Sequence, residues 1–195
     1  PGFELAQSRN FEPILRNIID YSRFAADDLV KRSYLMVSEM LNTLSSFLET
    51  GRYDLIPYIE ALRQRVGELS QLNARLMITY LKGRELGKFL KFRSASHIYS
   101  TILLENLIDL LAEIIMDLAK QSSVIGKKIW ANSALYNGLR RSLNEASRLI
   151  DEAIKAYLSP NLEQIQSILS LPREHLSEIL KEEVEEAPIK DKQLV

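Results

Sequence analysis

The chain has 195 residues, of which 46% are hydrophobic and 26% are charged, and its 25 Lys and Arg nearly balance its 26 Asp and Glu. This is the composition of an ordinary globular protein, and a net charge of −1 gives no general attraction to nucleic acid or to an anionic membrane. Because the chain has no cysteine, disulfides, thiolate catalysis and cysteine-based zinc sites are excluded.

The first 22 residues are expected to form a linker with one short helix. Phe3 and Leu5 alternate with polar residues, and a polar stretch follows them. A helix over about 13–20 would place Pro13 in its first turn, where the missing N–H of proline costs nothing. Since the chain starts at Pro1 and not at methionine, we expect a further N-terminal segment to precede it.

Long helices are predicted for most of the remaining chain. Apolar residues recur at alternating steps of three and four, and glycines stand where the stretches end, as at Gly51 and Gly83. The long helices are expected over about 23–50, 55–82, 86–121 and 132–158, and shorter ones over 161–170 and 172–185.

The fold class predicted from this pattern is all-α. Helices with such spacing and short connections pack antiparallel at shallow angles, which indicates an elongated antiparallel helical bundle. The expected organisation is a linker with a short helix at 1–22, three long helices at 23–121, further helices at 132–187 and a tail at 188–195.

Glu105 and Asp109 stand four residues apart in the third long helix, so they lie on one face, one turn apart. At about 100° per residue, they fall largely opposite a broad apolar face that we expect to pack in the core. That face comprises Leu103, Leu107, Leu110, Leu111, Ile114 and Leu118. The acidic residues then form a solvated stripe, a contact with a partner, or a cation site completed by carboxylates of a neighbouring helix. The acidic residues of this stretch also exclude a membrane-spanning helix.

The two histidines give little support for an enzyme. Neither His97 nor His175 follows a glutamate by three residues, which disfavours a ferritin-like di-iron site. We expect His97 to be partly buried and His175 to lie at the surface. No glycine-rich phosphate loop and no Ser-His-Asp arrangement can be identified. A basic cluster near Trp130 is either solvated or a docking patch; it comprises Lys127, Lys128, Arg140 and Arg141.

The stretch Leu104-Glu105-Asn106-Leu107-Ile108-Asp109-Leu110 resembles the signature Leu-Glu-Arg-Ile-Gly-Asp-His in the third helix of the PhoU family of phosphate-uptake regulators. Asn106 and Leu110 replace the Arg and His of that signature. The hairpin of two long helices joined at Gly51 is also similar to the family. The resemblance implies that residues 23–121 form a PhoU-like three-helix repeat and that residues 132–187 form a partial second helical repeat. The opening, residues 1–22, resembles archaeal members in which an AbrB-type domain precedes a PhoU-like region.

The resemblance implies a cytoplasmic, phosphate-responsive regulatory protein that is not an enzyme and acts by protein contacts. Its partners would be a phosphate transporter component or a regulator and further copies of itself, with DNA reached only through an AbrB-type domain before Pro1. It also implies a transition or divalent metal at Glu105 and Asp109. The second helix has Arg63 and Gly67 where the family has its other acidic motif. The alternative is a helical dimerisation or scaffold module of a transcription regulator with no bound ligand.

Overall fold

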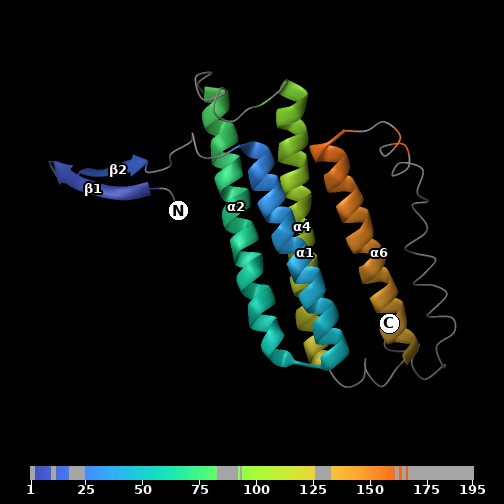
Figure 1. The fold of residues 1–195 in the computed structure, drawn as a ribbon. Helices are drawn as coiled ribbons and strands as arrows, with labels where there is room; N and C mark the ends of the chain where they lie inside the picture. Colours follow the sequence, from blue (N-terminus) through green and yellow to red (C-terminus); the bar gives the residue numbers. More distant parts are fainter. Residues whose placement is uncertain are drawn as a thin grey trace. The chain divides into compact units, whose positions relative to one another are not determined.

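Four long helices make up most of the computed structural model, which describes residues 3–9, 12–17, 25–82, 92, 94–125, 133–160, 163 and 166. The helices are α1 (Ala26–Thr50), α2 (Ile56–Lys82), α4 (Ala95–Ile125) and α6 (Ser133–Leu158) (Figure 1). The all-α prediction is confirmed for the described residues from 25 onward. Of the shorter helices expected after residue 160, only residues 163 and 166 are described, and both are helical; the predicted stop at Gly83 lies outside the described residues.

A β-hairpin near the N-terminus corrects one prediction. Strand β1 (Phe3–Arg9) pairs antiparallel with β2 (Glu12–Asn17), so residues 13–20 do not begin the short helix expected there. Pro13 falls between the pairs Ala6–Ile14 and Arg9–Glu12, where the register shifts. A proline is tolerated at such an irregularity of an edge strand as well as in a first helical turn, so it did not distinguish the two structures.

Gly51 ends α1, as the sequence predicts. Its φ of 66° lies in the left-handed region, which glycine enters without the steric penalty of a side chain. The Gly51 N–H donates to the Phe47 carbonyl oxygen at 2.8 Å. The Phe47 ring meets the edge of Tyr53 at a centroid distance of 5.7 Å, just before α2 begins. The turn is therefore held by a main-chain cap and an aromatic contact.

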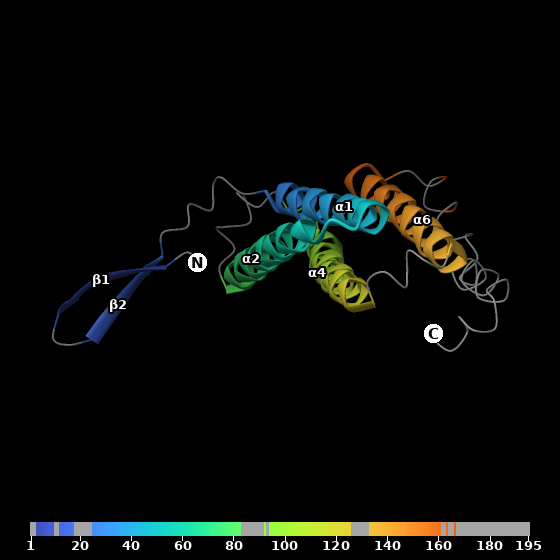
Figure 2. The same ribbon diagram turned by 90° about the horizontal axis from the view of Figure 1, so that it is seen from below.

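The chain forms two compact units, and α1, α2 and α4 each contribute to both. The first unit contains residues 1–33 and 64–110. Its core joins Leu29 of α1 to Leu76 of α2, and a neighbouring cluster joins residues of α1, α2 and the first turn of α4. Figure 2 shows the ribbons of these three helices side by side. That cluster consists of Ala26, Met77 and Ile98, with Tyr80 and Phe92 packed against it.

The second unit contains residues 34–63 and 111–195. Its described core includes side chains from all four helices, which are Val37, Met40, Leu44 and Phe47 of α1, Ile59 of α2, Ala112, Ile115 and Ala119 of α4, and Leu143 and Ile154 of α6. The domain boundaries predicted from the sequence stay predictions. No helix in the described part of the chain is long and apolar enough to cross a membrane.

The residues on the inner faces of α1, α2 and α4 follow alternating steps of three and four. This spacing averages 3.5 residues, the repeat that keeps one helix face against its neighbours over many turns. The positions are 26, 30, 33, 37, 40, 44 and 47 in α1, 59, 62, 66, 69, 73, 76 and 80 in α2, and 98, 101, 105, 108, 112, 115, 119 and 122 in α4.

The face of α4 that the sequence predicts to be buried is the wrong one. Leu103, Leu107, Leu110 and Ile114 are exposed, and Leu111 and Leu118 are half-buried. Glu105 lies in the core instead, on the same face as Ile108, Ala112 and Ile115. Since α4 carries apolar residues on two faces, its periodicity alone did not identify the face that packs.

The hydroxyl of Tyr34 in α1 donates to Asp151 Oδ1 in α6, which ties two helices of the second unit together. Burial, followed by the bond to Asp151, raises the pKa of Tyr34 above its usual value, so the hydroxyl remains a donor at neutral pH. We expect Tyr34→Phe to lower the free energy of unfolding by about 1–2 kcal/mol, because a hydrogen bond to a charged group is lost. Chemical denaturation measures this change.

Tyr58→Phe is the matched control. The Tyr58 hydroxyl lies 3.5 Å from Glu39 Oε1 on the exposed surface, so its loss should cost less than about 0.5 kcal/mol. Equal effects of the two substitutions would show that the bond to Asp151 does not stabilise the second unit.

Candidate functional site

Glu105 is the acidic residue that the structure sets apart from the rest of α4. Its side chain is only 3% exposed, although an isolated carboxylate is among the most costly groups to bury. Ser33 of α1 donates from its Oγ to Glu105 Oε1 at 3.4 Å, and Ser33 itself is fully buried. The predicted solvated stripe therefore holds for the exposed residues Glu113 and Asp117 but not for Glu105.

Asn73 of α2 is the third member of this buried group and is 2% exposed. It lies close enough to Glu105 for its amide to lower the pKa of the carboxyl, yet neither amide atom meets hydrogen-bond geometry with any described residue. Glu105 Oε2 has no hydrogen-bond partner there either. We call Ser33, Asn73 and Glu105 the polar layer, because each occupies a core position of its helix in the first unit.

Burial dominates the electrostatics of the polar layer. It raises the pKa of the Glu105 carboxyl above its ordinary value, and the nearby charge of Asp109 acts in the same direction. The nearby Asn73 amide and the hydrogen bond from Ser33 lower the pKa but do not offset the effect of burial. The layer therefore favours the protonated carboxyl, whose O–H can donate a hydrogen bond.

The neighbours of Glu105 offer few ligands for the metal site that the resemblance implies. Asp109 is half-buried, one turn beyond Glu105, whereas Ser33 and Asn73 supply uncharged oxygens. No group of three or more His, Cys, Asp or Glu that could hold a metal ion occurs among the described residues. Divalent cations prefer several anionic or well-placed oxygen ligands, so this layer fits them poorly. Metal binding at Glu105 and Asp109 stays a prediction.

Arg63, which stands where the family has an acidic motif, forms an ion pair in the second unit. Its Nη2 lies 2.6 Å from Glu113 Oε2, and its Nε also donates to that oxygen at 2.7 Å. The pair joins α2 to α4 and neutralises one carboxylate of the acidic stripe. The Glu113 carboxylate thus pairs with an arginine, as is common on helix surfaces.

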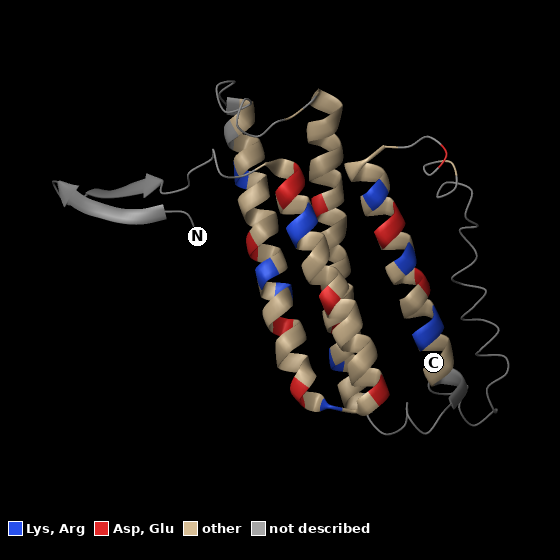
Figure 3. Cartoon of the chain, viewed as in Figure 1, with Lys and Arg blue, Asp and Glu red and all other residues tan. Residues whose placement is uncertain are grey.

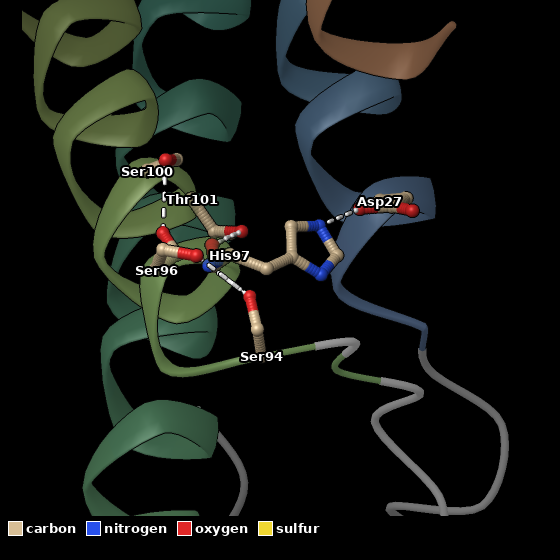
Figure 4. A network of polar contacts seen from close by, with 6 residues as sticks. All are labelled: Asp27, Ser94, Ser96, His97, Ser100 and Thr101. Atoms are coloured by element: carbon tan, nitrogen blue, oxygen red, sulfur yellow. Dashed lines mark hydrogen bonds and ion pairs between the residues drawn. The ribbon is translucent and has the colours of Figure 1, made fainter. Parts of the chain in front are cut away.

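His97 is partly buried, as predicted, and links the starts of two helices in the first unit (Figure 4). Its Nε2 lies 3.0 Å from Oδ1 of Asp27, in the first turn of α1. The His97 N–H donates to Ser94 Oγ at 3.1 Å, which makes Ser94 the N-cap of α4. The ring also meets the edge of Phe92 at 5.8 Å. These contacts position the start of α4 beside the start of α1.

The predicted basic cluster is only partly described. Arg140 Nη2 lies 3.0 Å from Glu49 Oε1, joining α6 to α1 in the second unit. Lys127, Lys128 and Trp130 lie outside the described residues, as does His175. The docking patch predicted there stays a prediction.

No family model, curated protein or solved structure matches this chain.

Ser33, Asn73 and Asp27 are the residues that sequence reasoning missed. Asn73 continues the three- and four-residue spacing of Val66 and Leu69. The sequence therefore could have indicated that its amide lies on the buried face of α2. A single buried Asn at such a position often specifies the register of packed helices. Ser33 similarly follows Val30 by three residues. Asp27 gave no sign of its contact with His97, because that contact depends on the tertiary structure.

Replacing Glu105 by Gln tests the ionisation of the polar layer. A carboxyl whose pKa is raised by folding binds its proton more tightly in the folded state, so its stabilising contribution is complete below the unfolded pKa. That contribution falls as the pH rises through the folded pKa. We expect the stability of Glu105→Gln not to decline in this way. At pH 8 its free energy of unfolding should exceed that of the wild type by about 1–3 kcal/mol, because Gln buries no charge.

Denaturation at a series of pH values from about 4.5 to about 8 measures this difference, since the ordinary pKa of Glu is about 4.3. Glu60→Gln on the exposed surface of α2 is the control and should keep the wild-type pH dependence. An unchanged decline in Glu105→Gln would contradict a neutral buried carboxyl.

Ser94→Ala should remove the N-cap of α4. We expect a loss of about 1 kcal/mol in the free energy of unfolding, the usual cost of deleting a serine cap. Ser100→Ala serves as control, because the exposed Ser100 hydroxyl only bonds back to the Ser96 carbonyl at 2.9 Å. If both variants lose the same stability, Ser94 does not cap the helix.

Proposed function

We propose that this chain is a PhoU-like regulatory module that works through protein–protein contacts and not through catalysis. The observation that carries the proposal is an apolar helix face left exposed on α4. In this proposal α1, α2 and α4 correspond to the antiparallel three-helix repeat of the PhoU family, and the module acts in the cytoplasm.

The exposed face, which we call the α4 face, lies in the first unit. Its residues are Tyr99, Ile102, Leu103, Asn106, Leu107 and Leu110. Tyr99 is 68% exposed and Leu107 is 53% exposed, in a helix whose other side is packed in the core. Judged from these exposures, the five apolar side chains present roughly 500 Å², near the upper end of patches on monomeric proteins. Patches of that size commonly mark interaction sites.

The charge distribution also favours a contact surface. Between Ala95 and Leu110 no exposed residue is charged, because Glu105 is buried and Asp109 is half-buried. Figure 3 shows the contrast, with charges along α6 and none in the first turns of α4. Depletion of charge is typical of the central part of a protein interface. A face that served only to contact solvent would not need to be kept free of charge over four turns.

The phosphate-responsive role rests on the resemblance of residues 104–110 to the PhoU signature. Glu105 and Asp109 keep the acidic spacing of that signature, and Glu105 also holds a core position. In the proposed module the contacts are with a phosphate transporter component or a regulator, and an AbrB-type domain, where one precedes this region, supplies the DNA contact.

A second candidate function is an assembly module with no ligand and no phosphate response. The polar layer favours it, because Glu105 is surrounded by Ser33 and Asn73 and not by further carboxylates. In this second function, the polar layer sets the register of the helices and has no other role. The two functions differ in whether phosphate physiology depends on the protein.

Deletion of the gene in its source organism tests the proposal. We expect the deletion strain to take up phosphate at a rate that no longer follows external phosphate, and the wild-type gene to restore the response. A gene with Leu103→Glu and Leu107→Glu should fail to restore it, because two charges on the α4 face oppose burial against a partner. Uptake of labelled phosphate is the measurement.

Leu81→Glu is the matched control, because Leu81 of α2 is 71% exposed but lies outside the α4 face. It should restore the response fully. Normal uptake in the deletion strain would contradict the phosphate role and leave the assembly module. Full restoration by the doubly substituted gene would contradict action through the α4 face.

A further inference from the structure

We infer that the α4 face packs against the α4 face of a second copy of this chain, with the twofold axis passing beside Asn106. The inference rests on the proposed function, since it names the partner of a surface that the proposal assigns to protein contacts. It commits to one partner because charge, area and the chemistry of Asn106 all suit self-association.

The lack of charge makes the α4 face compatible with itself. A twofold interface brings each patch onto an identical patch, so any charge near the axis would meet its own sign. The exposed residues between Ala95 and Leu110 impose no such repulsion. Glu113, the first exposed charged residue beyond them, already pairs with Arg63. Two copies can therefore meet over this stretch without a like-charge contact.

The area also agrees with what a stable dimer needs. Apolar atoms form about 65% of a typical homodimer interface. An apolar patch of roughly 500 Å² then corresponds to an interface of about 800 Å² per copy, which is the standard size for a specific complex. Polar atoms beside the stripe, among them the Ser100 hydroxyl, supply the remainder. A smaller contact would leave leucines of the α4 face exposed.

Asn106 places the axis. It stands near the middle of the stripe, between Leu103 and Leu107, and its side chain is exposed. Against an apolar partner surface, its amide would lose hydrogen bonds to water without replacement. Against Asn106 of the second copy, each amide can both donate and accept, which satisfies both groups. A polar residue of this kind within an apolar helix interface specifies its register.

The oligomeric state of the full chain tests the inference. Sedimentation equilibrium from about 1 to about 100 μM should show a reversible dimer for the wild type. Leu103→Glu with Leu107→Glu should raise the dimer Kd by at least about 100-fold, because four carboxylates would enter one interface. Leu81→Glu, the control, should change the Kd by less than about threefold. Circular dichroism checks that each variant retains its helices.

Cysteine cross-linking tests the position of the axis, and the absence of native cysteine leaves one thiol per copy. Under added oxidant, Asn106→Cys should form a disulfide-linked dimer quickly, because the two thiols face each other across the axis. Gln71→Cys is the control at an exposed position of α2 in the first unit and should cross-link only slowly.

The outcomes separate this inference from the proposed function. A wild-type monomer throughout the range, or a dimer that survives both glutamates, overturns the inference, as does equally slow cross-linking at positions 106 and 71. If the doubly substituted gene then still fails to restore phosphate-responsive uptake, the α4 face binds a different protein and the proposed function stands. If the dimer behaves as expected in both tests but phosphate uptake does not depend on the gene, the inference is supported and the phosphate role is overturned.

Discussion

The orientation of α4 about its own axis is the constraint on which the remaining features depend. With one face inward, Glu105 enters the core and the leucines face outward; a rotation of α4 by about half a turn, or roughly 180°, would exchange them. Residue size favours the observed orientation. The inner face includes Ala112 and Ala119, both fully buried, and small side chains allow helices to approach closely. Leucines at those steps would hold the helices further apart.

The polar layer adds specificity to this packing. Ser33 and Asn73 occupy core steps of α1 and α2, and only the observed orientation of α4 brings Glu105 to them. In a low-dielectric interior an ionised carboxyl would be costly, so burial favours the neutral form that can donate as well as accept a hydrogen bond. Buried polar groups of this kind contribute little to stability and more to the choice among alternative packings. In this respect Glu105 acts as a structural residue.

The helices could be predicted from the sequence because their signals are local. Steps of three and four, and glycine at position 51, place the ends of α1, α2 and α6 within a few residues. The strand at Glu12–Asn17 was missed because Pro13 fits both a first helical turn and an irregular edge strand. Residue spacing, glycine and proline each report the conformation of only a few neighbouring residues. They therefore predict helix ends but not tertiary contacts.

The candidate site could be predicted only in part, because its partners are tertiary. Glu105 was identified from its spacing to Asp109, but its burial depends on which face of α4 packs. That choice was ambiguous in the sequence, where Leu107 and Ile108 are adjacent and both apolar. The contacts of Glu105 with Ser33, and of His97 with Asp27, join residues about 70 positions apart. No periodicity within one helix carries that information.

The two faces of α4 are linked by their sequence. Glu105 and Asn106 are consecutive, so the residue that holds the register inside the first unit and the residue assigned to the twofold axis belong to one rigid turn of helix. A contact that rotated α4 to improve leucine packing would pull Glu105 away from Ser33 and expose its carboxyl. Conversely, ionisation of Glu105 would favour a rotation toward water, because the charged form is the one penalised by burial. Assembly at the α4 face and packing of the polar layer therefore place requirements on the same turn of helix.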